Sequence, residues 1–365
     1  MTEPPILAEP RPTGAGRWPR SVQWPVLLVG SVALVVPLEL AGFPAALLLG
    51  PMIAAIVLGV GDARMRVARP LFILAQAVIG LMMAKALPPA VFVELVEDWP
   101  IYALGIGSVV VVAAGLGILL ARLKVLPGTT AIWGSAPGAA ATIVIMADAF
   151  GADARLVAFM TYLRVALVAL AASLVARLAV PGGAPLPAID WFPPVEPVAF
   201  AQTVALIVVA MVVATLLRMP VGAIFFTMIL GVLLQNLAGL RIELPPVLLA
   251  TAFTLIGWSI GLRFTRDILL HAWRALPAVV GSIVALIAAC GAFAFLLVWL
   301  AGLDPLTAYL ATSPGGADSV AIIAANSAVD VPFVMAMQAG RLLVVTLTGP
   351  ALARYIATRK WAREL

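Results

Sequence analysis

Cysteine and histidine are almost missing from this chain of 365 residues, which contains one of each. The single cysteine, Cys290, excludes an internal disulfide and a thiolate metal cluster. The single histidine, His271, lies in a basic stretch and is expected to be solvated. The sequence has no His/Cys/carboxylate cluster at metal-ligand spacing, no Walker loop and no dinucleotide fingerprint. We therefore expect no cofactor, no metal and no enzymatic activity.

Charged residues are scarce as well, at 11% of the chain, whereas 64% of it is hydrophobic and its mean hydropathy is +1.14. This composition is typical of a polytopic membrane protein. An apolar run of about 20 residues can cross the hydrocarbon core of a bilayer as a helix. We predict an all-α protein with spans at residues 22–41, 43–60, 70–87, 100–120, 154–178, 199–217, 221–238, 247–262, 277–300 and 332–357.

The distribution of basic residues predicts topology rather than a nucleic-acid partner. The net charge is +5, but most lysines and arginines lie in short loops between apolar runs. The positive-inside rule places the tails, residues 1–21 and 358–365, in the cytoplasm. The linker 179–198 has two acidic residues and no basic one, so it is expected in the periplasm. We expect a multi-pass protein of the bacterial inner membrane, with the lipid bilayer as its surroundings.

One stretch of the sequence occurs twice. The first copy begins SAPGAAATIV at Ser135 and the second begins TSPGGADSVA at Thr312. A single shift of 177 residues, the difference between Pro137 and Pro314, aligns them without a gap. The same shift aligns further pairs, namely Gly80 with Gly257, Asp153 with Asp330, and Arg164 with Arg341. We predict two membrane repeats, residues 22–178 and 199–357.

Each Pro-Gly pair lies within a further apolar segment, 129–149 or 306–326. About ten helical residues on either side of each pair would span about 15 Å, half the hydrocarbon thickness. Re-entrant segments also leave the basic loop 263–274 and the C-terminus both cytoplasmic. A broken spanning helix is the alternative. Five crossings and one re-entrant element per repeat would make the second repeat inverted, which is the pattern of secondary transporters.

The polar residues of these elements are the candidate site. Arg164 and Arg341 lie about 15 Å into their spans, where an arginine is costly and a functional role is the default hypothesis. Each is interpreted as an anion ligand or, alternatively, as a structural ion pair, with Asp318 the partner of Arg341, or a cap on broken-helix carbonyls. Asp153 and Asp330 are expected to cap helices. The candidate substrate-binding residues are Ser135, Pro137, Gly138, Thr142, Arg164, Ser313, Pro314, Gly315, Asp318, Ser319, Asn326, Gln338 and Arg341.

The two Pro-Gly elements, with the sequence IGLRF at Ile260–Phe264, resemble the AbrB family of duplicated bacterial membrane proteins over residues 25–357. This family is distinct from the soluble transition-state regulator of the same name. The resemblance implies an inner-membrane protein, labelled in some cases a regulator of gene expression and in others an ammonia monooxygenase. It supplies no catalytic residue. One histidine is too few for the copper or iron site of a monooxygenase, and no cytoplasmic segment is large enough for a DNA-binding domain.

The sequence therefore favours a secondary transporter of a small solute, anionic if the arginines bind it, with H⁺ or Na⁺ as coupling ion. A membrane sensor or regulatory component that acts indirectly on gene expression is the second hypothesis. A membrane monooxygenase is a distant third. An oligomer is compatible with the sequence.

Overall fold

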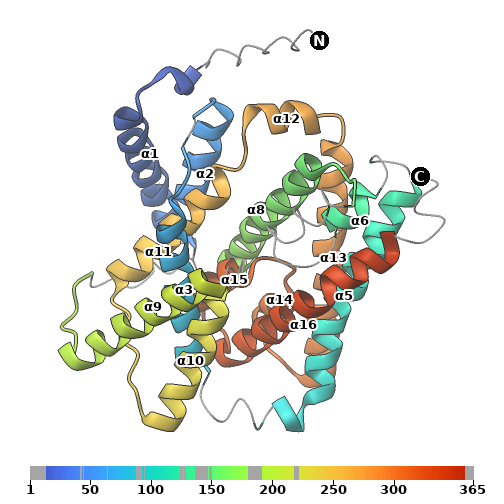
Figure 1. Cartoon of the computed structure of the whole chain (residues 1–365). Helices are drawn as coiled ribbons and strands as arrows, with labels where there is room; N and C mark the ends of the chain where they lie inside the picture. The colour runs from blue at the N-terminus through green and yellow to red at the C-terminus, as the bar shows by residue number, and fades with distance from the viewer. Residues whose placement is uncertain are drawn as a thin grey trace.

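The structure, a computed structural model, describes residues 14–41, 43, 45–63, 65–87, 93, 95–123, 126, 129–135, 147, 150–179, 191–217 and 222–357. Over this part the chain is all-helical and contains no strand, as expected (Figure 1). The candidate residues Pro137, Gly138 and Thr142 lie outside the described residues, as does the side chain of Asp318.

A helix occupies each of the ten predicted spans, with ends that agree to within three residues. These helices are α1 (Arg20–Leu40), α2 (Ala46–Val60), α3 (Arg69–Lys85), α5 (Trp99–Arg122), α8 (Ala154–Ala179), α9 (Pro197–Leu217), α10 (Gly222–Ala238), α11 (Pro246–Gly261), α13 (Leu276–Ala301) and α16 (Val331–Ala357). The apolar runs thus predicted the helices well.

Five of these helices are long and apolar enough to cross a membrane, namely α1, α5, α8, α9 and α13. A sixth span results if α11 and the short helix α12 (Arg266–Ala272), which are bent by 52°, count as one. The apolar helices α2 and α10 are shorter. The structure therefore fits a multi-pass membrane protein, while the full count of ten crossings stays a prediction.

Three short helices form the described parts of the two Pro-Gly segments. In the second segment α14 (Pro305–Thr312) and α15 (Ala317–Ala325) are separated by the break that contains Pro314 and Gly315. In the first, α6 (Thr130–Ser135) ends where the described part stops. Asp304 caps α14, because its Oδ2 accepts a hydrogen bond of 2.8 Å from the Thr307 N–H.

The helices of the two halves begin at corresponding positions. The shift of 177 residues takes the first residue of α1 to that of α9, and likewise α3 to α11, α5 to α13 and α8 to α16. The duplication in the sequence is therefore matched by a duplication of helices.

These helices pack into two lobes, each of which combines corresponding helices from both halves. The first lobe contains α1, α2, α3, α9, α10 and α11, and the second contains α5, α6, α8, α13, α14, α15 and α16 (Figure 1). In the first lobe the halves exchange partners, since α3 packs against α10 and α11 packs against α2. The duplicated glycines allow this close packing. A Cβ at Gly80 would lie 2.6 Å from the Ile224 carbonyl oxygen, and one at Gly257 would lie 2.6 Å from that of Leu48.

Contacts between the lobes are fewer than those within them. The helix α15 of the second lobe packs against α3 of the first. The short helix α12 packs against α8 of the second lobe and also contacts α2 of the first. Between α11 and α12, the Arg263 guanidinium lies 5.4 Å from the ring centre of Tyr162 on α8. Next to it, Phe264 meets Phe159 edge to face at 6.2 Å. The two lobes therefore share a limited boundary, to which the tip region of the second segment contributes.

Candidate functional site

Both Pro-Gly segments return to the end of the molecule at which they begin. At the start of the first segment, the Thr130 hydroxyl accepts a hydrogen bond of 3.1 Å from the Asp153 N–H at its end. In the second segment, the Thr307 hydroxyl accepts one of 3.1 Å from the Asp330 N–H. A helix that continued across the molecule would separate these residues, so each segment begins and ends on the same side of the fold. We call them the first hairpin (residues 130–153, of which 136–146, 148 and 149 lie outside the described residues) and the second hairpin (residues 307–330).

An aspartate caps the helix that follows each hairpin, as predicted. The Asp153 carboxylate accepts from the Leu156 N–H at 3.1 Å, and the Asp330 carboxylate accepts from the Phe333 N–H at 3.0 Å. These bonds satisfy N–H groups that have no partner within α8 and α16. Both aspartates thus lie at the open ends of the hairpins, away from the breaks.

At the second hairpin, Arg341 holds the carbonyl groups of the break. The side chain comes from α16 and is 7% exposed. Its guanidinium donates to the carbonyl oxygen of Ser313 and, at 2.6 Å, to that of Gly315. The proline and glycine interrupt the helix, so these carbonyls have no helical partner. Arg341 lies about 16 Å along α16 from Asp330, which places the break at about half a membrane thickness from the open end.

Arg164 has the corresponding place at the first hairpin. It comes from α8, is 8% exposed, and donates to the Ser135 carbonyl oxygen at 3.3 Å. The structural alternative from the sequence, a cap on carbonyls at the helix break, is thus found at Arg341, while Arg164 binds the carbonyl of the last described residue of α6. The interpretation as an anion ligand stays a prediction.

The other second-hairpin candidates are buried around the break. Gln338 on α16 donates to the Leu310 carbonyl oxygen at 2.8 Å. Its own Oε1 and the Ser313 hydroxyl are buried without a hydrogen-bond partner among the described residues. Pro314 and Ser319 are buried too. Gly315 is half-buried against α8, where a Cβ would meet the Val168 side chain at 3.0 Å. The second hairpin therefore contacts the helix that carries Arg164.

Asn326 is not part of this arrangement. It is exposed at the C-terminal end of α15, where its side-chain amide donates to the Ile322 carbonyl oxygen at 2.8 Å. The sequence placed it in an apolar segment, but α15 has already ended there and the chain is returning to the open end of the hairpin. We therefore interpret Asn326 as a helix cap rather than a binding residue.

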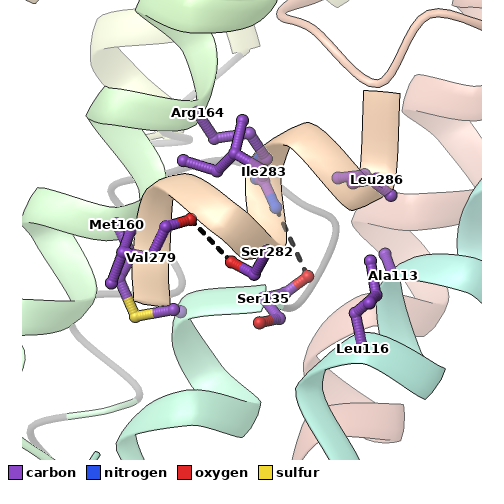
Figure 2. Close-up of a pocket in the computed structure, with 10 residues that line it drawn as sticks. Ala113, Leu116, Ser135, Met160, Arg164, Val279, Ser282, Ile283 and Leu286 are labelled. Atoms are coloured by element: carbon purple, nitrogen blue, oxygen red, sulfur yellow. Dashed lines mark hydrogen bonds between the residues drawn. The ribbon is translucent and has the colours of Figure 1, made fainter. Parts of the chain in front are cut away.

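A small cavity lies beside Arg164 in the second lobe, between α5, α6, α8 and α13. Its volume is about 20 Å³, which is room for roughly one water molecule. Figure 2 shows Arg164, Ser135 and Ser282 around it, with Met160 on one side and Ala113 and Leu116 on the other. The Ser282 hydroxyl donates to the Val279 carbonyl oxygen at 2.7 Å. Ser282 and Met160 were not among the predicted site residues, since a single serine or methionine in an apolar helix does not indicate a binding site.

His271 is exposed, as expected, but it lies in the short helix α12 rather than in a loop. Its Nε2 is 2.6 Å from Oδ2 of Asp153. Partial burial raises the pKa of Asp153, but the hydrogen bond to His271 and those from the Leu156 and Arg155 N–H groups outweigh it, so the pKa is lowered. This pair ties the start of α8 to α12.

Within the described residues, no group of three or more histidine, cysteine, aspartate or glutamate side chains is placed to hold a metal ion. Among the candidate side chains that the structure describes, the charged ones are the two arginines, each held at its own hairpin.

A family model described as "Transition state regulatory protein AbrB" matches residues 47–357, which include both hairpins and both arginines. The chain belongs to the AbrB family. A relative, "Putative regulator AbrB" of Escherichia coli (strain K12), is 46% identical over 339 residues, covering 92% of this chain and 97% of the relative. No solved structure matches the chain. The resemblance seen in the sequence is thus confirmed over most of the chain.

Proposed function

We propose that this AbrB-family protein is a secondary transporter of a small anionic solute that binds between the two hairpins. One observation carries the proposal: in each hairpin a hydrogen bond joins the two ends, and a buried arginine binds a backbone carbonyl next to or within two residues of the Pro-Gly pair. Irregular backbone at membrane depth is tolerated where protein buries it or where it lines a cavity. Paired breaks of this kind form the solute sites of secondary transporters.

Parity supports an inverted second repeat. If every predicted span crosses, each half has five crossings and one hairpin that returns. An odd number of crossings leaves the second half with the opposite orientation. The exchange of partners between α2, α3, α10 and α11 is compatible with a two-fold relation between the halves.

The division into two lobes supports alternating access. Contacts between the lobes are limited, and α15 of the second hairpin packs against α3 of the first lobe. A movement of one lobe against the other would therefore change the surroundings of the hairpins. The cavity beside Arg164 has room for roughly one water molecule, so a larger solute requires such a movement.

Counterflow in proteoliposomes tests transport. The full chain would be reconstituted and the exchange of labelled lactate, pyruvate, succinate and phosphate measured against protein-free liposomes. We expect exchange of at least one anion, and its loss in Arg164→Gln. Replacing Na⁺ by choline, and then varying the pH gradient, distinguishes Na⁺ from H⁺ as the coupling ion. If none of the anions exchanges above the protein-free level, the proposal of anion transport is wrong.

Topology provides a second test. We propose that both termini are cytoplasmic and that the linker is periplasmic. In a background without Cys290, single cysteines at Gly183 and Thr358 should react with an impermeant thiol reagent from opposite sides of the membrane. Reaction of both from the same side would contradict the arrangement of spans and hairpins.

Regulation of gene expression is the second candidate function, and the comparisons favour it over transport. The observation in its favour is the name of the relative with 46% identity, "Putative regulator AbrB". Since no cytoplasmic segment has the size of a DNA-binding domain, we propose an indirect effect, through a transported solute or a partner protein. Transcript profiles of a deletion strain complemented with the natural chain or with Arg164→Gln separate these routes. An effect through the solute is lost in Arg164→Gln, whereas an effect through a partner persists.

A further inference from the structure

A methionine occurs at corresponding positions in the two halves, but the glycine that it packs against comes from a different helix in each half. Met160 on α8 corresponds to Met337 on α16 under the shift of 177 residues. Met160 packs against Gly134 of α6, where a Cβ would lie 2.8 Å from the methionine methyl group. Met337 packs instead against Gly105 of α5, where a Cβ would overlap its methyl group.

The residues at the exchanged positions explain this difference. Gly134 corresponds to Ala311, so the second half has a Cβ at the position where the first half has none. Gly105 corresponds to Ser282, which lines the cavity beside Arg164. A methionine side chain is flexible and fills the gap that a glycine provides. Met160 therefore leaves the space beside Ser282 open, whereas Met337 fills the corresponding space beside Gly105.

Both arginines bind carbonyl oxygens of their own segments. Arg341 donates to those of Ser313 and Gly315, on either side of Pro314. Arg164 donates to the Ser135 carbonyl oxygen at 3.3 Å, and its side chain also lines the cavity (Figure 2). Space for a ligand atom thus lies beside the arginine of the first half.

We propose that the two half-sites are unequal: the cavity beside Arg164 accepts one oxygen atom of a singly charged carboxylate group, and Arg341 is a positioning residue that holds the second hairpin. This rests on the proposed function, in that it assumes an anionic solute. A carboxylate matches the planar donor geometry of a guanidinium. Among the described residues that line the cavity, Arg164 is the one that carries a charge, which favours a single negative charge. The Ser282 hydroxyl, which now donates to the Val279 carbonyl, can rotate towards a bound oxygen.

The test uses the purified full chain and formate, the smallest carboxylate. The midpoint of thermal unfolding is measured against sodium formate concentration, with sodium chloride and sodium phosphate at equal ionic strength. A ligand that binds the folded state raises the midpoint in proportion to the logarithm of its concentration above Kd. We expect a rise with formate that exceeds the rise with chloride or phosphate.

The glycine positions provide matched variants. Gly134→Ala should push the Met160 side chain towards the cavity and raise the apparent Kd for formate at least tenfold. Ala311→Gly makes the opposite change in the other half and should leave that Kd unchanged. Arg164→Gln should abolish the formate effect. Arg341→Lys should lower the midpoint without formate, because one of two capped carbonyls loses its donor, while the rise with formate remains.

Three results would overturn the inference. They are no formate-specific rise in the natural chain, an equal rise with chloride, and loss of the rise in Arg341→Lys together with its retention in Arg164→Gln. The last result would place the anion at the second hairpin without contradicting the proposed transport function. Transport is tested by a different measurement, and the absence of anion exchange in proteoliposomes would contradict it.

Discussion

The exchange of helices between the halves can be tested at Gly257, where α11 meets α2. In Gly257→Ala the added Cβ would lie 2.6 Å from the Leu48 carbonyl oxygen and 3.1 Å from the Met52 nitrogen. Both atoms belong to the backbone of α2, so no side chain can turn away. Reaching an ordinary contact of 3.4 Å requires the two helices to separate by about 0.8 Å, the difference between 3.4 and 2.6 Å.

The expected cost follows from packing. Overfilling a close-packed contact costs about 1–3 kcal/mol. Alanine in place of glycine within a helix regains up to about 1 kcal/mol through its higher helix propensity. Gly281→Ala isolates this gain, since Gly281 lies in α13 with nothing within 4 Å of an added Cβ. We therefore expect Gly257→Ala to be less stable than Gly281→Ala by about 1–3 kcal/mol.

Unfolding of the purified protein by sodium dodecyl sulfate in mixed micelles measures this difference. The natural chain, Gly257→Ala and Gly281→Ala would be compared at equal detergent composition. Gly80→Ala, at the corresponding contact between α3 and α10, should behave like Gly257→Ala. Equal stability of Gly257→Ala and Gly281→Ala would refute the close contact of α11 with α2, and with it the exchange.

Three further outcomes are expected. The pKa of Asp153 is lowered in the folded state, so its stabilising contribution is present above its ordinary pKa of 3.8 and is lost as the pH falls through the lowered value. In Asp153→Asn, the midpoint of thermal unfolding should therefore depend less on acid pH. Thr307→Val should destabilise the second hairpin by about 0.5–1.5 kcal/mol, because the Asp330 N–H loses its acceptor, whereas Thr307→Ser should restore it. Thr130→Val should act similarly at the first hairpin, and in both cases exchange of the Asp N–H hydrogen with deuterium should become faster.

Helix positions were predictable from the sequence because the signals are local. An apolar run of sufficient length requires a helix in a bilayer, where each backbone group needs a partner within its own segment. The caps at Asp153 and Asp330 were predictable for a similar reason, since the aspartate binds N–H groups two or three residues ahead. The duplication predicted the two halves, because two copies of one pattern identify the residues that correspond.

Part of the site was predictable as well. An arginine deep in an apolar run needs a polar partner, and breaks at Pro137 and Pro314 leave carbonyls without donors. The structure brings Arg164 and Arg341 to their own hairpins, as this complementarity suggests. The same logic did not locate Asn326, which lies away from the break, because hydropathy alone does not show where the second hairpin turns back.

The sequence alone determined the helices, the two corresponding halves and the buried arginines. The tertiary structure decided that α3 pairs with α10 and α11 with α2, and that space lies beside Arg164. In a soluble helix the apolar face predicts the packing side, but a membrane helix is apolar towards lipid and protein alike. Partner choice then depends on the fit of small residues against a distant backbone. The sequence does not indicate that Gly134 packs against Met160 and Gly105 against Met337. Only the packed structure shows these contacts.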